Sequence, residues 1–197
     1  MKRAAILAAA AALVLSGCVA PLGPVEVTRF HLPDVSALGK GTIAVEAAPG
    51  LDPQSLEWKS YQAAVARQLT LLGYGQPASG AISTQVAVLR LSRQIYRPES
   101  ASSPVSVGVG GSTGSYGSGV GLGIGLNLAG RPAEQVRTEL GVIIKDRASG
   151  TALWEGRASF QVKAASPLAD TQLGAAKMAE ALFVNFPGIS GQTIEVK

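Results

Sequence analysis

Few residues of this chain have the type and spacing that catalysis or metal binding requires. His31 is the only histidine; it falls in a predicted strand, and no serine or cysteine is placed as a nucleophile for it to activate. The acidic residues Glu57, Glu134, Glu139 and Asp146 are scattered, without the close pairing typical of general acid–base catalysis. A metal site would favour paired cysteines or histidines, and the chain has one of each. We therefore predict a non-enzymatic protein with no catalytic, cofactor-binding or metal-binding residue, although such groups can also converge only in the folded chain.

The residue with the clearest chemistry is Cys18, the single cysteine. It follows Leu15, Ser16 and Gly17, and these four residues resemble the bacterial lipobox. In that motif the thiol takes a diacylglycerol, the signal is cleaved just before the cysteine, and the new amine is acylated. Small residues at 16 and 17 let a peptidase reach the backbone, and only a thiol can form the thioether. A buried structural cysteine behind an ordinary leader is the alternative.

The N-terminal segment has the order of a secretory signal. Met1-Lys2-Arg3 is positively charged, residues 4–14 are uncharged and mostly apolar, and small residues follow. The apolar run is shorter than the roughly 20 residues that a membrane-spanning helix needs. We predict a signal peptide over residues 1–17 and a lipidated tether over residues 18–24. Because no aspartate follows Cys18, the resemblance to lipoproteins of diderm bacteria implies transport to the outer membrane, with the protein facing the periplasm.

Composition limits what the mature chain can do. Removing residues 1–17 from the 197 leaves 180 residues, enough for one domain with a hydrophobic core. The 17 basic residues minus Lys2 and Arg3 leave 15 against 13 acidic ones, a net charge of +2. This balance, without a basic cluster, argues against a nucleic-acid partner. With Cys18 lipidated, no disulfide forms within the chain, so packing alone must hold the fold.

Three strands are predicted in the first half of the chain. Residues 25–31 and 41–47 are rich in β-forming residues, and we expect Phe30 in the core. Residues 82–96 form a longer strand candidate with an apolar centre. Three arginines lie toward its far end: Arg90, Arg93 and Arg97. They could grip phosphate or peptidoglycan carboxylates, whereas solvated charges at a strand end are the more common case.

Two helices are predicted from caps and apolar spacing. The first has Asp52 as N-cap and Pro53 at its first position, and Gly73 ends it. Its apolar stripe recurs every three or four residues: Trp58, Tyr61, Val65, Leu69 and Leu72. The second is capped by Asp170 and runs to about Phe186. Its apolar face is predicted from Leu173, Ala175, Met178, Ala179, Leu182 and Phe183.

The clearest hairpin joins residues 136–146 and 151–163 through a turn in which Gly150 takes a positive φ. Its apolar faces are Leu140, Val142 and Ile144 on the first strand and Trp154, Phe160 and Val162 on the second. Trp154 beside Gly156 suggests a buried ring packed over a glycine, with a binding site as the alternative. Residues 193–196 are expected to be a last, short extended segment.

The segment 102–131 is an insert rich in glycine. Between Gly108 and Gly125 half of the residues are glycine, and in an extended chain the alternation puts glycine on one face and valine or leucine on the other. The insert lacks a Gly-Lys-Ser/Thr ending and a helix after it, so we do not expect nucleotide binding. We predict a flexible loop or a loosely formed hairpin with its tip near Tyr116. Its edge could pair with a strand from a second copy or from a partner.

Several short motifs spread over the mature chain resemble one family. They are Tyr61-Gln-Ala-Ala-Val65 with Leu71-Leu-Gly73-Tyr74, Gln85-Val-Ala-Val88, Asp146-Arg-Ala-Ser-Gly150 with Leu153-Trp-Glu-Gly156, and Ala181-Leu-Phe183 with Asn185-Phe-Pro-Gly188. Together with the lipobox they resemble the bacterial outer-membrane lipoprotein family named domain of unknown function 4136. The glycine-rich insert looks variable relative to that pattern. The resemblance implies an α+β envelope lipoprotein without an assigned activity, and it carries no catalytic residues.

We therefore expect one α+β domain over residues 25–197, with a mostly antiparallel sheet, two helices packed on one face, and the insert at 102–131. The expected function is that of a non-enzymatic, lipid-anchored envelope lipoprotein, a binding or assembly module on the periplasmic side of the outer membrane. Its partners would be the membrane, through lipid on Cys18, and an unidentified envelope protein or a second copy. No cofactor is expected. The alternative is a cell-wall or lipid-modifying enzyme whose site is not visible in the sequence.

Overall fold

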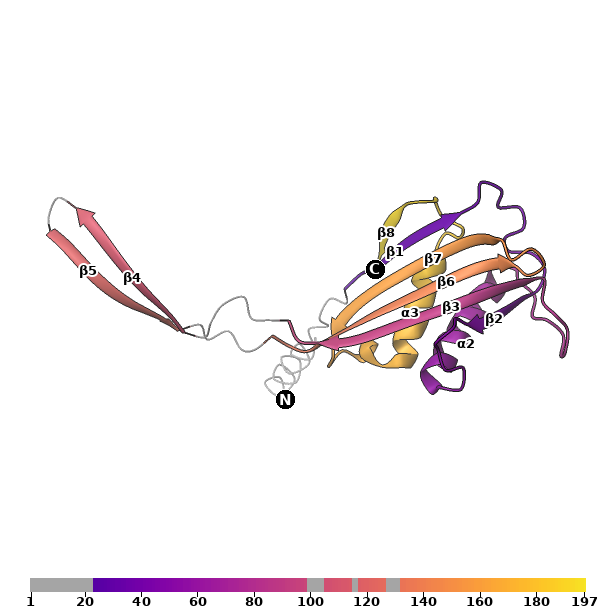
Figure 1. The fold of residues 1–197 in the computed structure, drawn as a ribbon, viewed down its shortest axis with the longest axis horizontal. Coiled ribbons are helices and arrows are strands. Elements are labelled where there is room, and N and C mark those ends of the chain that lie inside the picture. Colours follow the sequence, from indigo (N-terminus) through magenta and orange to yellow (C-terminus); the bar gives the residue numbers. More distant parts are fainter. Residues whose placement is uncertain (1–22, 99–104, 115–116, 127–131) are drawn as a thin grey trace, which may run out of the picture.

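The computed structural model describes residues 23–98, 105–114, 117–126 and 132–197, and for residues 105–126 it describes the backbone. The elements follow in the order β1 (Val25–His31), β2 (Ile43–Ala47), α2 (Leu56–Leu71), β3 (Gln85–Tyr96), β4 (Val105–Gly114), β5 (Gly117–Leu126), β6 (Gln135–Asp146), β7 (Ala152–Lys163), the 3-10 turn η2 (Pro167–Ala169), α3 (Thr171–Phe183) and β8 (Thr193–Val196) (Figure 1).

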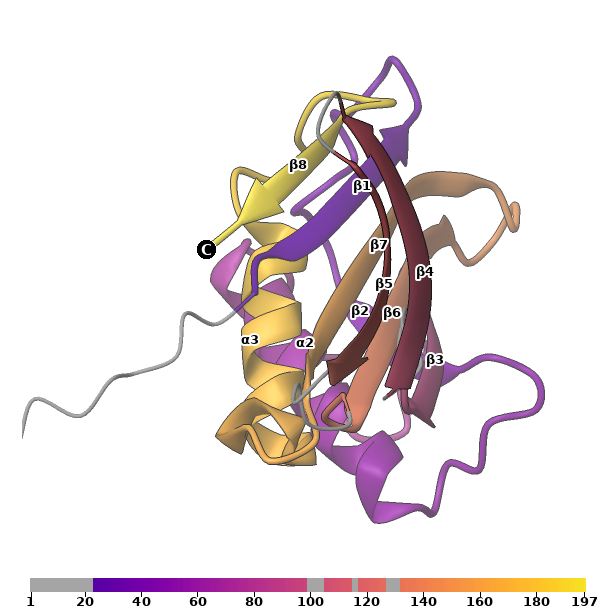
Figure 2. The same cartoon turned by 90° about the vertical axis from the view of Figure 1, so that its left-hand side faces the viewer.

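One mixed sheet organises the domain. Its six strands have the order β2-β3-β6-β7-β1-β8, and β4 and β5 form a separate two-stranded sheet. The pair β2–β3 is parallel, and the other neighbouring pairs of the six-stranded sheet are antiparallel. Helices α2 and α3 lie on the same face of this sheet (Figure 2). The expected α+β class, with two helices on one face of a mostly antiparallel sheet, is confirmed.

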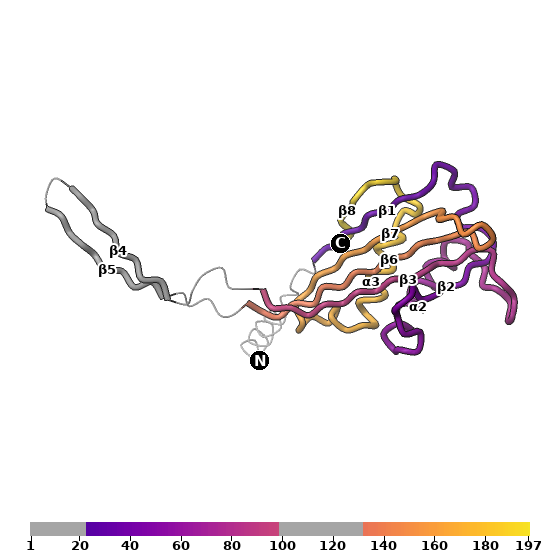
Figure 3. The backbone as a smooth tube through the Cα atoms, viewed as in Figure 1, coloured from indigo at the N-terminus to yellow at the C-terminus, as the bar shows by residue number. Residues whose placement is uncertain are grey.

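The two ends of the described domain meet in the sheet. The first strand, β1, lies between β7 and β8, so the last strand of the chain pairs with the first (Figure 3). Val25 is opposite Val196 and Thr28 is opposite Thr193. The predicted strand at residues 193–196 is therefore confirmed, and closing the sheet in this way requires contacts between residues far apart in the sequence.

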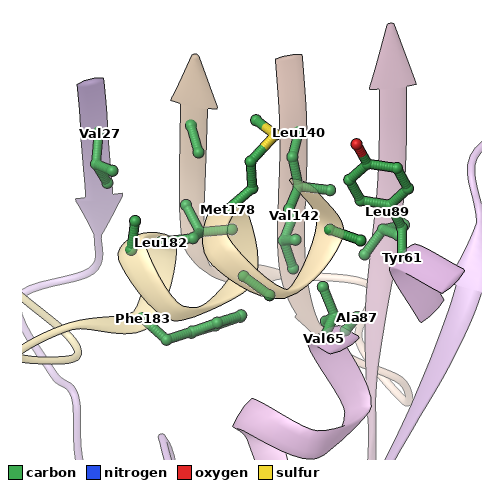
Figure 4. Packing of buried hydrophobic residues seen from close by; sticks show 14 of the residues in the cluster. Val27, Tyr61, Val65, Ala87, Leu89, Leu140, Val142, Met178, Leu182 and Phe183 are labelled. Carbon is green, nitrogen blue, oxygen red and sulfur yellow. The ribbon is translucent and has the colours of Figure 1, made fainter. Parts of the chain in front are cut away.

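The core fills the space between the sheet and the two helices. Leu89, Leu140 and Val142 face it from the sheet, and Val65 and Met178 face it from the helices; all five are fully buried (Figure 4). The predicted faces of the β6–β7 hairpin are buried as expected. Burying a side chain of this size stabilises the fold by about 1.5–3 kcal/mol, so these predicted faces supply much of the driving force for folding.

Trp154 belongs to this core. It is 1% exposed, and its ring stacks on Phe183 with a centroid separation of 5.4 Å. Its indole Nε1 donates a hydrogen bond to the carbonyl of Pro187 at 3.0 Å. Gly156 leaves the room that this packing needs, because a Cβ there would lie 2.8 Å from Cδ1 of Leu182. The structure thus favours packing over a binding site at this position.

The expectation that Phe30 lies in the core is wrong. Its side chain is 50% exposed, while Val25, Val27 and Arg29 are buried. Side chains alternate between the two faces of a strand, so the two valines fix the inward face of β1 at the odd positions. Arg29 therefore occupies the inward position that the sequence analysis gave to Phe30.

The first helix starts three residues later than predicted. Ser55 is the N-cap of α2, and its Oγ accepts a hydrogen bond from the backbone N–H of Trp58 at 3.1 Å. Asp52 and Pro53 instead begin a turn, in which the N–H of Ser55 donates to the carbonyl of Asp52 at 3.2 Å. Aspartate followed by proline suits the first two positions of such a turn as well as a helix start. The predicted end is confirmed, since Gly73 follows the helix with φ +100°.

The second helix differs from its prediction at one end and on one face. Asp170 caps α3 as predicted, but the helix ends at Phe183 rather than near Phe186. Leu173 was expected on the apolar face and is 52% exposed. Nine residues of helix turn through about 900°, so Leu173 faces away from the buried Leu182. Gly174 takes part in the contact instead, since a Cβ there would meet the carbonyl of Leu168 at 2.8 Å.

Candidate functional site

The predicted lipid attachment at Cys18 lies outside the described residues, as do the signal peptide at 1–17 and most of the tether at 18–24. Within the part of the chain that the structure describes, no helix is both long and apolar enough to cross a membrane. The anchor at Cys18 stays a prediction.

His31 is held by backbone carbonyls. Its ring Nδ1 lies 2.7 Å from the carbonyl of Leu32, and its Nε2 lies 3.3 Å from the carbonyl of Gly188. The nearby hydroxyl of Ser190 contacts the backbone N–H and carbonyl of His31 rather than the ring. The ring is thus fixed between two backbone segments, a structural role that closes the end of β1 against the loop before β8.

Arg29 is a buried cation for which no role was predicted from the sequence. It is 4% exposed; its Nε donates to the carbonyl of Leu182 at 3.0 Å and its Nη2 to that of Ala181 at 3.1 Å. These carbonyls belong to the last turn of α3, where the helix dipole favours a positive charge. Burial lowers the pKa of this guanidinium, which nevertheless stays charged near neutral pH. The signal was present in the sequence, because Arg29 continues the alternation of Val25 and Val27.

The three arginines, Arg90 and Arg93 in β3 and Arg97 just after it, do not form one anion-binding site. Arg93 points to the helix side of the sheet, where it donates to Thr171 Oγ1 at 3.2 Å, pairs with Glu57 Oε1 at 3.4 Å and reaches the carbonyl of Ala169. Arg90 lies three positions earlier and so occupies the opposite face. Arg93 therefore joins the end of β3 to both helices rather than to an external anion.

Tyr61 lies near Glu57 and Arg93, and the pKa of its phenol is raised. Burial raises the pKa of its phenol to about 12, and the nearby Glu57 adds to the rise, while Arg93 and a hydrogen bond with Thr138 oppose it. A phenol with this pKa stays protonated near neutral pH and does not act as a base there. Tyr61 and Thr138 together satisfy polar groups inside the core, as buried polar groups must be.

The acidic residues considered for catalysis are engaged in local contacts. Glu139 pairs with Arg137 at 3.5 Å. Asp146 accepts hydrogen bonds from the backbone N–H and the hydroxyl of Ser149 at 2.8 and 2.7 Å, and these bonds lower its pKa. Across the described residues, no group of three histidine, cysteine or acidic side chains could hold a metal ion. Of these acids, Glu57 and Glu139 thus lie in ion pairs and Asp146 in a turn, and not in one site.

A shallow groove runs along the outer side of the two helices. It consists of two hollows of about 460 and 530 Å³, which share Ala63. The lining combines apolar side chains with side chains of both charges. It includes Leu56, Lys59, Ser60 and Gln172 at one end, and Arg67, Leu71, Ala176 and Glu180 at the other. Ligand sites are usually concave and mostly apolar with a few convergent polar groups. This open groove lacks that character.

The glycine-rich insert forms a hairpin with an uninterrupted pairing register. Of the two predicted alternatives, loop or hairpin, the structure has the hairpin: β4 pairs antiparallel with β5 from Val105–Leu126 to Gly114–Gly117 without a shift in register. Tyr116, predicted at the tip, lies outside the described residues. We call the paired strands β4 and β5 the ribbon.

The register gives the ribbon two different faces. Residues directly opposite each other share a face, and alternate residues along a strand do too. All seven apolar positions fall on one face, together with Gly111, Thr113 and Ser118 toward the turn: Val105, Val107, Val109, Val120, Leu122, Ile124 and Leu126. The other face carries glycine and serine alone: Ser106, Gly108, Gly110, Ser112 and Gly114 on β4, and Gly117, Gly119, Gly121, Gly123 and Gly125 on β5. The alternation seen in the sequence is thus matched across the two strands.

The pairing register of the ribbon is the same as that of β3 with β6. The β3–β6 ladder ends at the pair Tyr96–Gln135, and the β4–β5 ladder begins at Val105–Leu126. Eight residues, 97–104 and 127–134, therefore separate the two ladders on each strand. The two ladders therefore have the same register, since equal numbers of residues separate them on the two sides.

Comparison with known proteins identifies no relative by sequence. Neither the family models nor the curated proteins gave a match. Among solved structures, a PDZ domain protein from Parabacteroides distasonis aligns with 96% of this chain at 13% identity and a TM-score of 0.47, and this chain covers 42% of its length.

Two structures of a PelC dodecamer from Paraburkholderia phytofirmans, one of them a variant, align with 80% of this chain at 13% identity and a TM-score of 0.40, over 96% and 97% of their own chains. At such identities, and with TM-scores below 0.5, these likenesses carry no inference about function or assembly. The resemblance to the lipoprotein family named above stays a prediction.

Proposed function

We propose that this chain is a lipid-anchored envelope lipoprotein whose ribbon is the binding element of a non-enzymatic assembly module. The observation that carries the proposal is the register of β4 with β5, which collects seven apolar positions on one face. Large contiguous apolar patches on protein surfaces commonly mark interaction sites.

The absence of charge around the ribbon supports a contact with apolar material. Between Glu99 and Arg131 the sequence has no lysine, arginine, aspartate or glutamate. The folded domain, by contrast, has its candidate chemical groups in structural contacts, His31 between two carbonyls and Arg93 between two helices. Both features favour a module that presents a surface over an enzyme that holds a substrate.

The anchor part of the proposal rests on Leu15-Ser16-Gly17-Cys18 and is tested by mass. The protein purified from envelopes is expected to begin at Cys18 and to weigh more than residues 18–197 by the mass of its acyl groups, since several acyl chains on one cysteine give stable membrane attachment. A Cys18→Ser variant is expected to lack this excess and to keep its leader. An unmodified Cys18, or a chain that starts elsewhere, would contradict the anchor.

The binding part is tested separately by crosslinking in intact envelopes. The full chain is expected to capture an envelope component, and a variant in which a short Gly-Ser linker replaces residues 108–125 is expected to lose that capture while remaining folded. Equal capture by both forms would remove the ribbon from the binding site and leave the anchor untouched.

A further inference from the structure

We propose that the apolar face of the ribbon packs against the same face of a second copy of this chain. This inference rests on the proposed function in one respect, that the ribbon is the binding element. It adds the identity of the partner and the face that is used.

The register makes the apolar face complementary to itself. Two-fold contacts between identical chains use the same patch on both partners. Apolar positions lie opposite one another in the ribbon, as at Val109–Leu122 and Val107–Ile124. Three pairs of apolar positions thus lie opposite each other, at 105–126, 107–124 and 109–122, and Val120 lies opposite Gly111. Two copies related by a two-fold axis would face each other with identical rows, as the inner faces of a sandwich of two sheets do.

Charge complementarity points to an equally uncharged partner. The nearest charged residues in the sequence are Glu99 before the ribbon and Arg131 after it. Interfaces between different proteins commonly use complementary charges to select the partner and its orientation. The ribbon offers no charge for such selection, whereas a second ribbon matches it in having none.

The area of the face agrees with what a dimer needs. Burying a valine, leucine or isoleucine removes about 60–120 Å² of apolar surface. Seven such positions offer roughly 400–800 Å² per copy. Stable interfaces bury about 800 Å² per partner and need roughly 1,000 Å² in total. Two ribbons reach that range without help from the rest of the domain.

A second copy would also stabilise the hairpin. A two-stranded hairpin alone is at best marginally stable in water, and three or more strands with a covered apolar face are needed. In the described part of the chain, β4 and β5 pair with each other and with no further strand. Two ribbons face to face supply four strands and cover both apolar faces.

The two faces allow a matched test. Full-length chains with two different tags are co-expressed, crosslinked in intact envelopes through amines, and one tag is purified. One variant places two aspartates on the apolar face, Val107→Asp with Val109→Asp. The control places two on the glycine–serine face of the same strand, Ser106→Asp with Ser112→Asp. Aspartate adds no amine, so the crosslinker acts equally on all forms.

We expect the wild type and the control to capture the second tag, and the apolar-face variant to capture it about ten-fold less. Thermal midpoints are measured for all three to confirm that each is folded. No capture by the wild type, or equal capture by the apolar-face variant, overturns the proposal. Equal loss in both variants overturns the choice of face.

The outcome is separable from that of the proposed function. A lipid-free Cys18 with intact capture of the second tag would contradict the anchor and leave this inference standing. Capture of a different envelope protein or of lipid through the ribbon, with no second copy, would keep the proposed function and overturn this inference.

Discussion

Arg29 lies under the end of α3, where it gives two hydrogen bonds to carbonyls that the helix itself cannot satisfy. A buried charge is costly unless it is paired and hydrogen-bonded. Here the partner is the negative end of a helix and not a carboxylate. One side chain thus ties the inner face of β1 to the last turn of α3.

Replacing Arg29 with alanine is expected to lower the free energy of unfolding by about 3 kcal/mol, because it leaves two buried carbonyls without donors and removes packed volume. Arg157→Ala is the control: Arg157 lies on the opposite face of neighbouring β7 with a side chain 64% exposed, and should cost less than about 1 kcal/mol. Denaturant unfolding measures both. Similar losses would show that the helix end contributes nothing particular.

Trp154 contributes through packing in the same region. Trp154→Ala is expected to cost about 3–5 kcal/mol, since it removes a ring that is 1% exposed, stacks on Phe183 and lies tilted against Phe186. The half-exposed Phe30 provides the comparison, and Phe30→Ala should change stability by less than about 1 kcal/mol. A small loss at Trp154, seen in the same denaturant experiment, would move this residue from the core to a binding surface.

At the scale of elements, the ribbon and the main sheet have separate hydrogen-bond ladders. The six strands of the main sheet pair without β4 or β5, and the two connecting segments have equal lengths. Loop closure depends only weakly on loop length. The stability of the domain and the interaction surface of the ribbon can therefore be changed independently.

Replacing residues 108–125 with a short Gly-Ser linker is accordingly expected to keep the free energy of unfolding within about 1 kcal/mol of the wild type. Calorimetry on both forms measures it, with the near-ultraviolet signal of the Trp154 environment as a check on the core. A large fall in melting temperature would mean that the ribbon contributes to the core sheet.

At the scale of the whole molecule, stability should depend on alkaline pH through Tyr61. The pKa of Tyr61 is raised from 10.0 to about 12 in the folded chain, so the protonated phenol favours folding. Its contribution is fully present below pH 10 and is lost as pH rises from 10 to 12, by about 3 kcal/mol for a shift of two units. Burial also raises the pKa of Tyr74, which acts in the same direction.

Unfolding free energies measured between pH 9 and 12 are expected to fall less steeply in Tyr61→Phe than in the wild type. Tyr96→Phe, at a residue 38% exposed, serves as the control for removing a phenol from the protein. Identical slopes in the wild type and Tyr61→Phe would show that Tyr61 does not titrate differently on folding.

Local periodicity in the sequence predicted most of the strands and helices and most of the core. Alternation fixed the inner faces of the β6–β7 hairpin, helical spacing fixed the stripe from Trp58 to Leu69, and Asp170 and Gly73 marked helix ends. The prediction from local sequence was wrong at Asp52-Pro53, because these two residues suit a turn as well as a helix start. The structure has the turn.

Contacts between residues far apart in the sequence become visible only in the folded chain. The parallel pairing of β2 with β3, the place of β1 between β7 and β8, and the burial of Arg29 against α3 arise from contacts over long sequence separations. The ribbon was predicted from the sequence in part. Its alternation is visible in the sequence, but alternation alone does not say which residues of the two strands lie opposite each other. The register decided that, by placing Val105, Val107 and Val109 opposite leucine or isoleucine, because a slip of one residue would have mixed the two faces.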